Sequence, residues 1–459
     1  MRLGHFDPPS PLASIAPAAI CADATVAGAR DAVTQSVALV KNAMDADDAV
    51  AAGVSSGSPM PSRLLPRLPL RADGTARSVA VIGPAAVQPA SLLSYYGPTG
   101  NCGGKMYTMV DAVRAHRAGD ATRYVAGLNT TLGDAVPAQL AAAAAAAAAA
   151  DVTVLCLGTD LSAAREERDA QNITIPAGQV ALLAAVAAAA PAPIIVVVFT
   201  ATPLDLSALL ADPKVGAIVH AGQPSVQTLG IGDVLFGAKV PAGRLVQTVY
   251  PAAYADEVSI FDFNMRPGPS LFPRPDCAAP YTDCKMGTNP GRTHRFYTGD
   301  AVLPFGFGLS YTSFAYSFAA APPTAVSLAP LAPLLAKARH GFVRAADELA
   351  AGGHAAAFIV NVTNTGTLDA DDAVLGFLTP PGAGQGGVPL QSLFGFERVH
   401  VKAGATVTVY LYPALTEFAQ VGLDGTRAAL PGRYTVRFGE ARSAKQGQQG
   451  FLEHSFEAV

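Results

Sequence analysis

Five consecutive charged residues, REERD, interrupt a chain in which only 14% of the residues are charged. They lie in the segment LGTDLSAAREERDAQNITIP, residues 157–176, together with Asp160. A carboxyl group in such a loop can transfer a proton if it comes within hydrogen-bond distance of the reacting atom. The same residues can instead form a solvated loop whose ion pairs contribute little to stability. Glu166 and Glu167 are the candidates for proton transfer, whereas Asp160 and Asp169 are expected to bond loop amides.

Other candidate catalytic, phosphate-binding and metal-binding residues are less strongly indicated by the sequence. His220 ends the apolar segment VGAIVHAG, where a packed or hydrogen-bonded histidine is the stronger expectation than a catalytic one. The glycines of NCGGK lack the Walker spacing of a phosphate-binding loop, and no serine stands in a nucleophile elbow. The five cysteines are an odd number without a CxxC pair, so a zinc site is not expected.

Length and charge restrict the class of protein. The 459 residues are enough for two or three domains with hydrophobic cores of ordinary size. The net charge is −4 and the basic residues are scattered, so nucleic acid is not an expected partner. The apolar stretch at residues 180–199 approaches the length of a membrane-spanning helix, but Pro191 and Pro193 interrupt it. A helix before these prolines and a buried strand after them explain the stretch, so no membrane partner is expected.

Apolar strands alternate with single helices between residues 31 and 240. Buried strands are predicted at SVAVIG, DVTVLCLG, PIIVVVFTA and VGAIVHAG, and a helix at the alanine run 141–150. SVALVKN, residues 36–42, is predicted as the end of a helix that begins near Ala27. The alternation predicts an α/β sandwich, in which helices cover both faces of a mostly parallel sheet. Ligands of such sheets meet loops at the carboxyl ends of strands, and the charged segment directly follows DVTVLCLG.

Two further regions are predicted after the α/β sandwich. Residues 241–320 are rich in Pro, Gly, Tyr and Phe and are predicted as an irregular arm of the same domain. Arg292 and Arg295 are expected to anchor this arm by hydrogen bonds and stacking. A linker is predicted at 321–353, and the short strands at 354–459 predict an all-β sandwich of immunoglobulin-like type.

Several segments together resemble family 3 glycoside hydrolases. They are VAVIGP, LLSYYGPTGNC, the charged loop, GDVLFGAKVPAGRLVQTVYP, MRPGP, PGRTHRFYTGDAVLPFGFGLSYTSF, FIVNVTNTGTLDADDAVLGFL and LFGFERVHVKAGATVTV. These segments cover nearly the whole chain in the order typical of the family. MRP followed by PGRTHRFY and PFGFGLSYT is similar to the β-xylosidase branch in particular.

The resemblance implies a domain order and a partner. Family members carry a (β/α)8 barrel, then an α/β sandwich, then a fibronectin type III-like domain, which the resemblance assigns here to residues 354–459. The barrel contributes the aspartate nucleophile and most sugar contacts, and the sandwich lends the general acid/base from a loop. RLGHFD resembles the segment just after the barrel, so residues 1–30 are interpreted as a remnant and the barrel as a missing domain expected in cis.

The resemblance also implies a reaction. It is retaining hydrolysis of oligosaccharides that releases a terminal β-linked xylose, or alternatively arabinose or glucose, without a metal or organic cofactor. Retention needs two carboxyl groups about 5 to 5.5 Å apart, one as nucleophile and one as acid/base. Because the nucleophile belongs to the barrel, this chain is expected to supply only the acid/base side and to be inactive alone.

One position of the charged loop departs from the family pattern. Relatives of the β-xylosidase type carry a pattern like D-x-(S/T)-I-E-A-E-G-x-D-R ahead of N-x-T-x-P. Anchoring this sequence on NITIP places Asp169 on the aspartate and Glu166 on the second glutamate. The first glutamate, the usual acid/base, falls on Ala164, which has no proton to donate. Glu166 or Glu167 can substitute if the loop shifts, although the flanking arginines favour the ionised carboxylate, the wrong direction for an acid.

A non-catalytic role is the rival interpretation. In it the chain is a carbohydrate-binding or assembly module derived from such an enzyme. Ala164 and the missing barrel both favour this interpretation. A gene truncated at its start would produce the same missing barrel, so the two interpretations remain open at the level of sequence.

Secretion to the extracellular space is inferred from the resemblance and from glycosylation triplets, because MRLGHFDPPSP has no apolar signal region. Three triplets would permit glycosylation of a secreted chain: Asn129, Asn172 and Asn361. Cys277 and Cys284 bracket a short loop and are a candidate disulfide. Cys156 lies in an apolar strand and is expected to be a buried free thiol.

Overall fold

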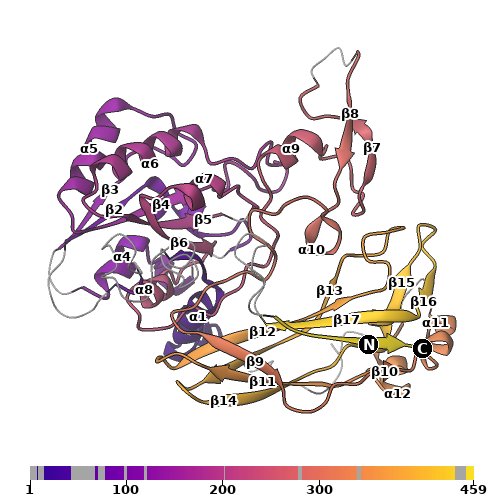
Figure 1. The fold of residues 1–459 in the computed structure, drawn as a ribbon. Helices are drawn as coiled ribbons and strands as arrows, with labels where there is room; N and C mark the ends of the chain where they lie inside the picture. Colours follow the sequence, from indigo (N-terminus) through magenta and orange to yellow (C-terminus); the bar gives the residue numbers. More distant parts are fainter. Residues whose placement is uncertain are drawn as a thin grey trace, which may run out of the picture.

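The computed structural model describes residues 8, 15–42, 68–70, 78–97, 101–117, 121–200, 202–277, 282–338, 343–439 and 451–459. In Figure 1 these residues form an α/β region, an arm and a C-terminal β region. The α/β region holds the described elements up to residue 240, the arm lies between residues 241 and 313, and the β region begins at residue 314.

A six-stranded sheet forms the centre of the α/β region. Its strand order is β1-β6-β5-β4-β2-β3. Neighbouring strands are parallel except for β1, which runs antiparallel to β6. The predicted mostly parallel sheet is therefore confirmed. The strands are β1 (Ala38–Asn42), β2 (Val79–Ile82), β3 (Thr122–Val125), β4 (Val152–Gly158), β5 (Ile194–Phe199) and β6 (Val215–Gly222).

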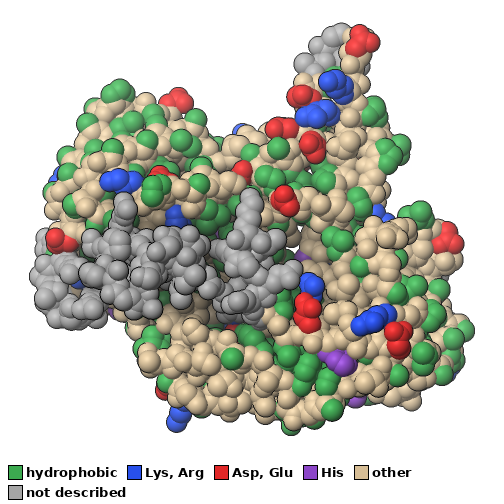
Figure 2. Space-filling view, in the orientation of Figure 1, with side chains coloured by type: hydrophobic (Ala, Val, Ile, Leu, Met, Phe, Trp, Pro, Cys, Tyr) green, Lys and Arg blue, Asp and Glu red, His purple; other side chains and the backbone are tan. Residues whose placement is uncertain are grey.

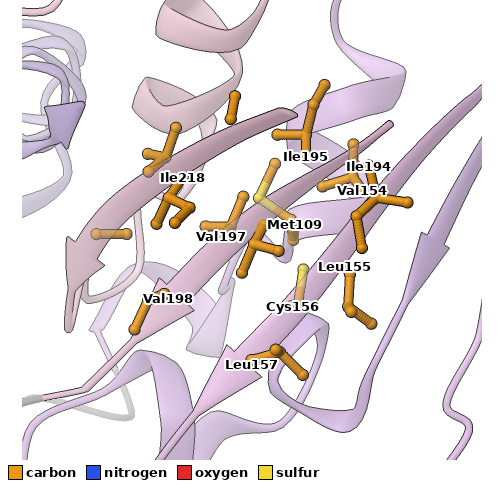
Figure 3. Packing of buried hydrophobic residues seen from close by; sticks show 14 of the residues in the cluster. Met109, Val154, Leu155, Cys156, Leu157, Ile194, Ile195, Val197, Val198 and Ile218 are labelled. Carbon is orange, nitrogen blue, oxygen red and sulfur yellow. The ribbon is translucent and has the colours of Figure 1, made fainter. Parts of the chain in front are cut away.

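The central strands are apolar because both of their faces are covered. Every residue of β2 and β5 is buried, as is usual for strands of a parallel sheet between two helical layers. Figure 3 shows side chains of β4, β5 and β6 packed together with Met109, which comes from a helix. Cys156 lies in this core as a buried free thiol, as its place in an apolar strand predicts.

Helices cover both faces of the sheet, as the alternating sequence pattern predicts. Figure 1 shows α5 and α6 on one face and α1, α4 and α8 on the other. The predicted alanine helix is α5, and its small buried side chains let α6 pack closely against it. The helices of this region are α1 (Asp23–Ser36), α3 (Pro89–Leu92), α4 (Met109–Arg114), α5 (Pro137–Ala148), α6 (Ala177–Ala189), α7 (Ser207–Ala211) and α8 (Leu229–Leu235), with short 3-10 turns η2 (Pro17–Cys21), η4 (Pro84–Ala86) and η5 (Asn101–Gly104).

Two apolar stretches, residues 36–42 and 180–199, could be interpreted as helix or as strand. The predicted helix end at residues 36–42 is wrong, because α1 ends at Ser36 and the next residues form β1. Pairing of β1 with β6, and a bridge from Leu39 to Leu309, decide the conformation of a run too short to show a period. The helix-then-strand interpretation of residues 180–199 is confirmed by α6 and β5. None of the described helices has the length and apolar character needed to span a bilayer.

The arm carries a two-stranded hairpin that projects from the molecule (Figure 1). The predicted anchoring is confirmed for Arg292, which donates a hydrogen bond to the carbonyl of Asp262. The Arg295 guanidinium lies 5.4 Å from the ring centroid of its chain neighbour Phe296. A disulfide joins Cys277 to Cys284 beside the hairpin. The elements of the arm are α9 (Ala253–Glu257), β7 (Gly268–Pro273), β8 (Met286–Asn289) and α10 (Thr293–Phe296).

Two sheets build the C-terminal β region, with orders β10-β18-β17-β12-β13 and β14-β11-β9. The predicted boundary at residue 354 is later than the first strand of this region, because β9 pairs with β11. The predicted linker contains β10, α11 and α12 rather than unstructured chain. The elements are β9 (Phe314–Phe318), β10 (Ala325–Val326), α11 (Leu331–Lys337), α12 (Ala345–Ala350), β11 (Phe358–Asn364), β12 (Ala370–Thr379), β13 (Ser392–Val401), β14 (Thr406–Leu411), η6 (Leu415–Phe418), β15 (Ala419–Val421), β16 (Arg427–Ala429), β17 (Gly432–Gly439) and β18 (Phe451–Ala458).

A buried ion pair joins the β region to the chain that follows the α/β region. Asp372 of β12 is fully buried, and its carboxylate lies 2.6 Å from an Arg244 guanidinium nitrogen. Tyr316 of β9 donates a second hydrogen bond of 2.7 Å to the same carboxylate. Arg244 also donates to the carbonyl of Gly308. One buried carboxylate therefore connects both sheets of the β region to the arm.

Candidate functional site

The charged segment lies at the carboxyl edge of the parallel sheet, together with the loops that follow β2, β5 and β6. Backbone hydrogen bonds join it to the loops after β2 and β5: the amide of Leu161 donates to the carbonyl of Ala90, and the amide of Asp205 donates to the carbonyl of Ile173. The loop after β6 bonds the loop after β2 through the Ser225 amide and the Leu92 carbonyl. This edge is where ligands bind in sheets of this kind. The sequence-based placement of the loop is therefore confirmed.

The start of the loop is held by a glycine and a buried amide. Gly158 ends β4 with φ +133°, and a side chain there would approach the Phe199 carbonyl oxygen to 1.9 Å. Gln179 of α6, which is almost fully buried, accepts a 2.8 Å hydrogen bond from the Gly158 amide and donates one of 2.6 Å to the Gly158 carbonyl. Gln179 also donates to the carbonyl of Thr131. The loop therefore leaves the sheet from a fixed position.

Asp160 has a structural environment. It is buried, and it accepts a 2.6 Å hydrogen bond from the Thr131 hydroxyl and one of 2.8 Å from the Ser162 amide. The Ser162 hydroxyl donates a further hydrogen bond to the same side chain. With its acceptor positions engaged by loop groups, this carboxylate fits the expected role of bonding a loop amide.

A tight turn presents Glu166 and Glu167 at the tip of the loop. The amides of Arg165 and Arg168 each donate to the other residue's carbonyl, at 3.0 and 2.9 Å. Glu167 takes φ +65°, and a positive φ at the third residue of a turn is typical of type II. Both glutamates are exposed to solvent, as a residue that must reach a substrate has to be.

Tyr96 reaches the loop tip from the loop after β2. Its hydroxyl donates a 2.9 Å hydrogen bond to a Glu166 carboxylate oxygen, and this bond raises the pKa of Tyr96. Sequence reasoning missed the pair, because Tyr96 is 70 residues away from Glu166 and stands in a separate quoted motif, LLSYYGPTGNC. The two adjacent tyrosines of that motif are the sequence signal that could have indicated a contact. In the structure Tyr96 is 80% exposed, far more than a tyrosine that packs in a core.

The remaining residues of the loop differ in exposure. Ala164 is partly buried, and its amide donates to the Asp160 carbonyl. Asp169 is exposed, and the carbonyl of its backbone accepts from Gln171. Among the described ion pairs, none links the arginines of REERD to its carboxylates. The local ion pairs that the solvated-loop interpretation included are therefore absent from the described ion pairs.

His220 lies at the same edge, near the end of β6. It pairs with Ala38 of β1 and with Val198 of β5. Burial lowers the pKa of His220 to about 4 and outweighs a backbone hydrogen bond that acts in the opposite direction. A histidine that is neutral and enclosed between two strands has the packed environment that the sequence favours over a catalytic role.

Hydroxyl groups line the edge between β4 and β5, and sequence reasoning missed them. The Thr159 and Thr200 hydroxyls lie 2.7 Å apart, and that of Thr202 lies 3.1 Å from Thr200. All three follow strand ends, so their place after DVTVLCLG and IIVVVF is the signal that would have found them. Such hydroxyls can donate or accept hydrogen bonds, and their described partners are one another and the backbone of Thr202 rather than a base that would make them nucleophiles.

Several other site predictions concern covalent chemistry and metals. No group of three potential metal ligands occurs among the residues that the structure describes. Asn129 and Asn172 are exposed, whereas Asn361 is partly buried within β11 and accepts from the Thr408 hydroxyl. A disulfide that the sequence did not reveal joins Cys21 to Cys102, which are 81 residues apart.

The fold and this edge define a class of protein: an α/β sandwich with exposed carboxylates at the carboxyl edge, followed by a two-sheet β region. Residues 66–311 match the family described as "Glycosyl hydrolase family 3 C-terminal domain". The chain belongs to glycosyl hydrolase family 3.

Xylosidases of plants and fungi are similar to most of this chain. It is 32% identical over 458 residues to "Beta-D-xylosidase 1" of Arabidopsis thaliana, a match that covers 96% of this chain and 52% of that protein. It is 35% identical over 375 residues to "Exo-1,4-beta-xylosidase bxlB" of Emericella nidulans, a match that covers 80% of this chain and 43% of that protein. The chain thus spans about half the length of the curated relatives that it matches.

Solved structures show the same fold. A "GH3 exo-beta-xylosidase (XlnD)" bound to a xylobiose aziridine probe superposes with a TM-score of 0.75 and 25% identity, over 98% of this chain and 50% of that one. A GH3 β-glucosidase of Bifidobacterium adolescentis superposes with a TM-score of 0.67 and 24% identity, over 95% and 53% of the two chains.

Proposed function

We propose that this chain supplies the acid/base side of a β-xylosidase-like active site, with Glu166 as the acid/base. The observation that carries the proposal is the position of Glu166: an exposed carboxylate at the carboxyl edge of the sheet, in contact with Tyr96. The buried bonds of Gln179 and Asp160 hold the base of the loop, so its tip is presented in a defined place. Glu167 is the alternative at the neighbouring turn position.

The proposed reaction needs a second carboxylate from a barrel domain facing this edge. That carboxylate attacks the anomeric carbon, while Glu166 gives its proton to the leaving glycosidic oxygen. The Glu166 carboxylate then takes a proton from water, and the water oxygen displaces the enzyme carboxylate and releases the sugar with retained configuration. The relatives from Arabidopsis thaliana and Aspergillus fumigatus are named as xylosidases. Their names support a terminal β-linked xylose of a xylo-oligosaccharide as the substrate, with arabinose or glucose as alternatives.

A non-catalytic module is the second candidate, and one observation favours it. Ala164 occupies the position of the usual family acid/base, and its side chain cannot transfer a proton. Under this candidate the loop contributes contacts to a carbohydrate or to an assembly partner, and the chain hydrolyses nothing even when a barrel is present.

Substitutions in a completed enzyme test the proposal. The chain is fused behind the N-terminal half of a xylosidase relative and assayed with nitrophenyl xyloside, arabinoside and glucoside and with xylobiose. Glu166→Gln is expected to lower kcat on xylobiose about 10²- to 10⁴-fold, the usual contribution of a general acid. The loss should be smaller on nitrophenyl xyloside, because that leaving group departs without full protonation. The chain alone is expected to be inactive.

Two matched variants decide between the candidates. Glu167→Gln removes the neighbouring carboxylate and is expected to change kcat little. Ala164→Glu restores the family pattern. If Glu166→Gln behaves like Glu167→Gln while Ala164→Glu creates activity in an otherwise inactive fusion, the proposed role of Glu166 is wrong and the non-catalytic candidate is supported.

The same proposal covers the cellular setting and the last domain. Secretion is supported by the two disulfides, which persist in oxidising compartments, and by the exposure of the Asn129 and Asn172 side chains to a glycosylating enzyme. Asn361 is the third proposed glycosylation site. The two packed sheets of the C-terminal region are proposed to be a fibronectin type III-like domain, because their strand pairs are antiparallel except for β10 with β18, as in a β-sandwich.

A further inference from the structure

A cavity of about 230 Å³ lies between the arm and the C-terminal β region, away from the charged loop. One wall comes from α10 and the chain after it, and the other from β12, β17 and β18. Its lining residues are Thr248, Thr293, His294, Tyr297, Gly299, Ala301, Pro304, Phe305, Phe377, Leu390, Gln391, Arg437 and Phe451. Ligand sites commonly occupy such positions between two structural units.

Aromatic rings form much of the cavity wall. His294 stacks on Phe305 with ring centroids 4.2 Å apart, and Phe377 meets both rings at about right angles, 6.2 Å from each. Phe451 lies 5.8 Å from the Arg437 guanidinium. Rings fixed by one another offer flat apolar surfaces at little cost in side-chain freedom.

A buried hydroxyl without a partner points to a ligand. Thr248 is only 5% exposed, and its Oγ1 has no hydrogen-bond partner in the described structure. A buried polar group left unpaired is costly, and a molecule bound in the cavity would satisfy this hydroxyl because Thr248 lines it. The Gln391 side chain adds an amide group to the same lining.

Thr293 supplies a second, independent sign of a built site. It takes φ +62°, a left-handed conformation that is uncommon for a β-branched residue. Its amide donates a 2.7 Å hydrogen bond to the Tyr250 hydroxyl, which holds this conformation. Strained backbone of this kind clusters at functional sites, and Thr293 lies in the cavity lining.

The lining carries little net charge. Arg437 is the charged side chain among the lining residues, and its Nε lies 2.7 Å from a Glu453 carboxylate oxygen. Burial and the neighbouring Arg295 lower the pKa of His294 to about 4, so its imidazole is neutral near pH 7. An anionic or cationic ligand would therefore find no unpaired opposite charge here.

We propose that this cavity binds one neutral pyranose ring, as a free monosaccharide or as the end of an oligosaccharide. The apolar faces of a pyranose pack on aromatic rings, and its hydroxyls pair with Thr248 and Gln391. The cavity is smaller than the roughly 300–1,000 Å³ of sites for drug-sized ligands, which limits the occupant to a single ring. This is a second sugar site, and it does not depend on the proposed catalysis.

Titration of the 459-residue chain with xylose and with glucose, followed by ligand-observed NMR, tests the proposal without any measurement of hydrolysis. A saturable Kd in about the millimolar range is expected for at least one sugar, the usual strength for one small polar ring. Thr248→Val removes the hydroxyl at nearly constant volume and should weaken binding about 5- to 10-fold, the typical effect of one hydrogen bond. Ala301→Phe should fill the cavity and abolish binding.

Three controls separate the outcomes. Thr406→Val makes the same change on an exposed strand position and should leave Kd unchanged. Glu166→Gln should also leave it unchanged, so failure of the catalytic proposal would not affect this one. No saturable binding of either sugar, or binding that both cavity variants leave intact, would overturn the proposal, as would stronger competition by an organic anion such as malonate than by the sugars. If Ala301→Phe does not fold, Thr248→Val still decides.

Discussion

Two carboxylates of the same loop, six residues apart, have opposite environments. Asp160 is buried and accepts hydrogen bonds from Thr131 and Ser162, whereas Glu166 is exposed and its described side-chain partner is the Tyr96 hydroxyl. A catalytic acid must be free to approach a substrate, and a structural carboxylate must not move. The partners of each residue therefore distinguish the role proposed for Glu166 from the role expected of Asp160 more clearly than residue type does.

His220 makes stability depend on pH. Its pKa is about 4 in the folded chain and about 6.5 when unfolded. Between these values the unfolded chain binds a proton that the folded chain does not, so stability is lost as the pH falls below about 6.5. At pH 5 we expect the folded state to be destabilised by roughly 2 kcal/mol relative to pH 7 through this residue.

Urea unfolding at pH 7 and pH 5 measures this effect. His220→Gln, which cannot be protonated, should lose about that much less stability on acidification than the unaltered chain. His354→Gln, at an exposed histidine, is the matched control and should not alter the pH dependence. Equal losses for the unaltered chain and His220→Gln would contradict the argument.

At the scale of elements, the β7–β8 hairpin and the chain just before it expose large apolar side chains. Phe263 and Leu271 are 85% and 87% exposed, and Phe261 is exposed beside Phe272. Figure 2 shows hydrophobic side chains over this arm. Exposed apolar groups gathered on one element promote association.

Light scattering of the 459-residue chain is therefore expected to show oligomers that grow with protein concentration. Combined replacement of Phe261, Phe263 and Leu271 by serine should shift the population toward monomer. Val246→Ser, which alters an equally exposed residue outside the hairpin, is the control and should have little effect. A monodisperse monomer of the unaltered chain would contradict this prediction.

Elements whose own residues favour one conformation could be predicted from the sequence, and elements whose conformation depends on distant partners could not. The buried strands β4, β5 and β6 and the alanine helix α5 follow from local composition. Strand β1 owes its conformation to β6 and Leu309, and β9 to β11, partners that are far away in the chain. The same limit explains why the loop could be placed at the carboxyl edge but the contact with Tyr96 could not be foreseen.

At the scale of the whole molecule, the pair of Arg244 and Asp372 connects the arm to the β region. Arg244→Met would leave the fully buried Asp372 without its counter-charge, and breaking such a pair typically costs about 3–5 kcal/mol. We expect a correspondingly lower Tm by calorimetry. Adding Asp372→Asn to the same chain removes the buried charge while keeping an acceptor for Tyr316, so it should recover part of the loss. A double variant less stable than Arg244→Met alone would contradict this account.

The cysteines provide a built-in reporter of unfolding. Four of them are paired, and the fifth, Cys156, lies in the centre of the sheet, where burial raises the pKa of its thiol (Figure 3). Since thiolates are the reactive form, Cys156 of the folded molecule should not react with a disulfide-exchange reagent such as dithionitrobenzoate. One equivalent should react when the sheet opens, so the labelling rate at increasing urea would follow the opening of this core without any engineered label.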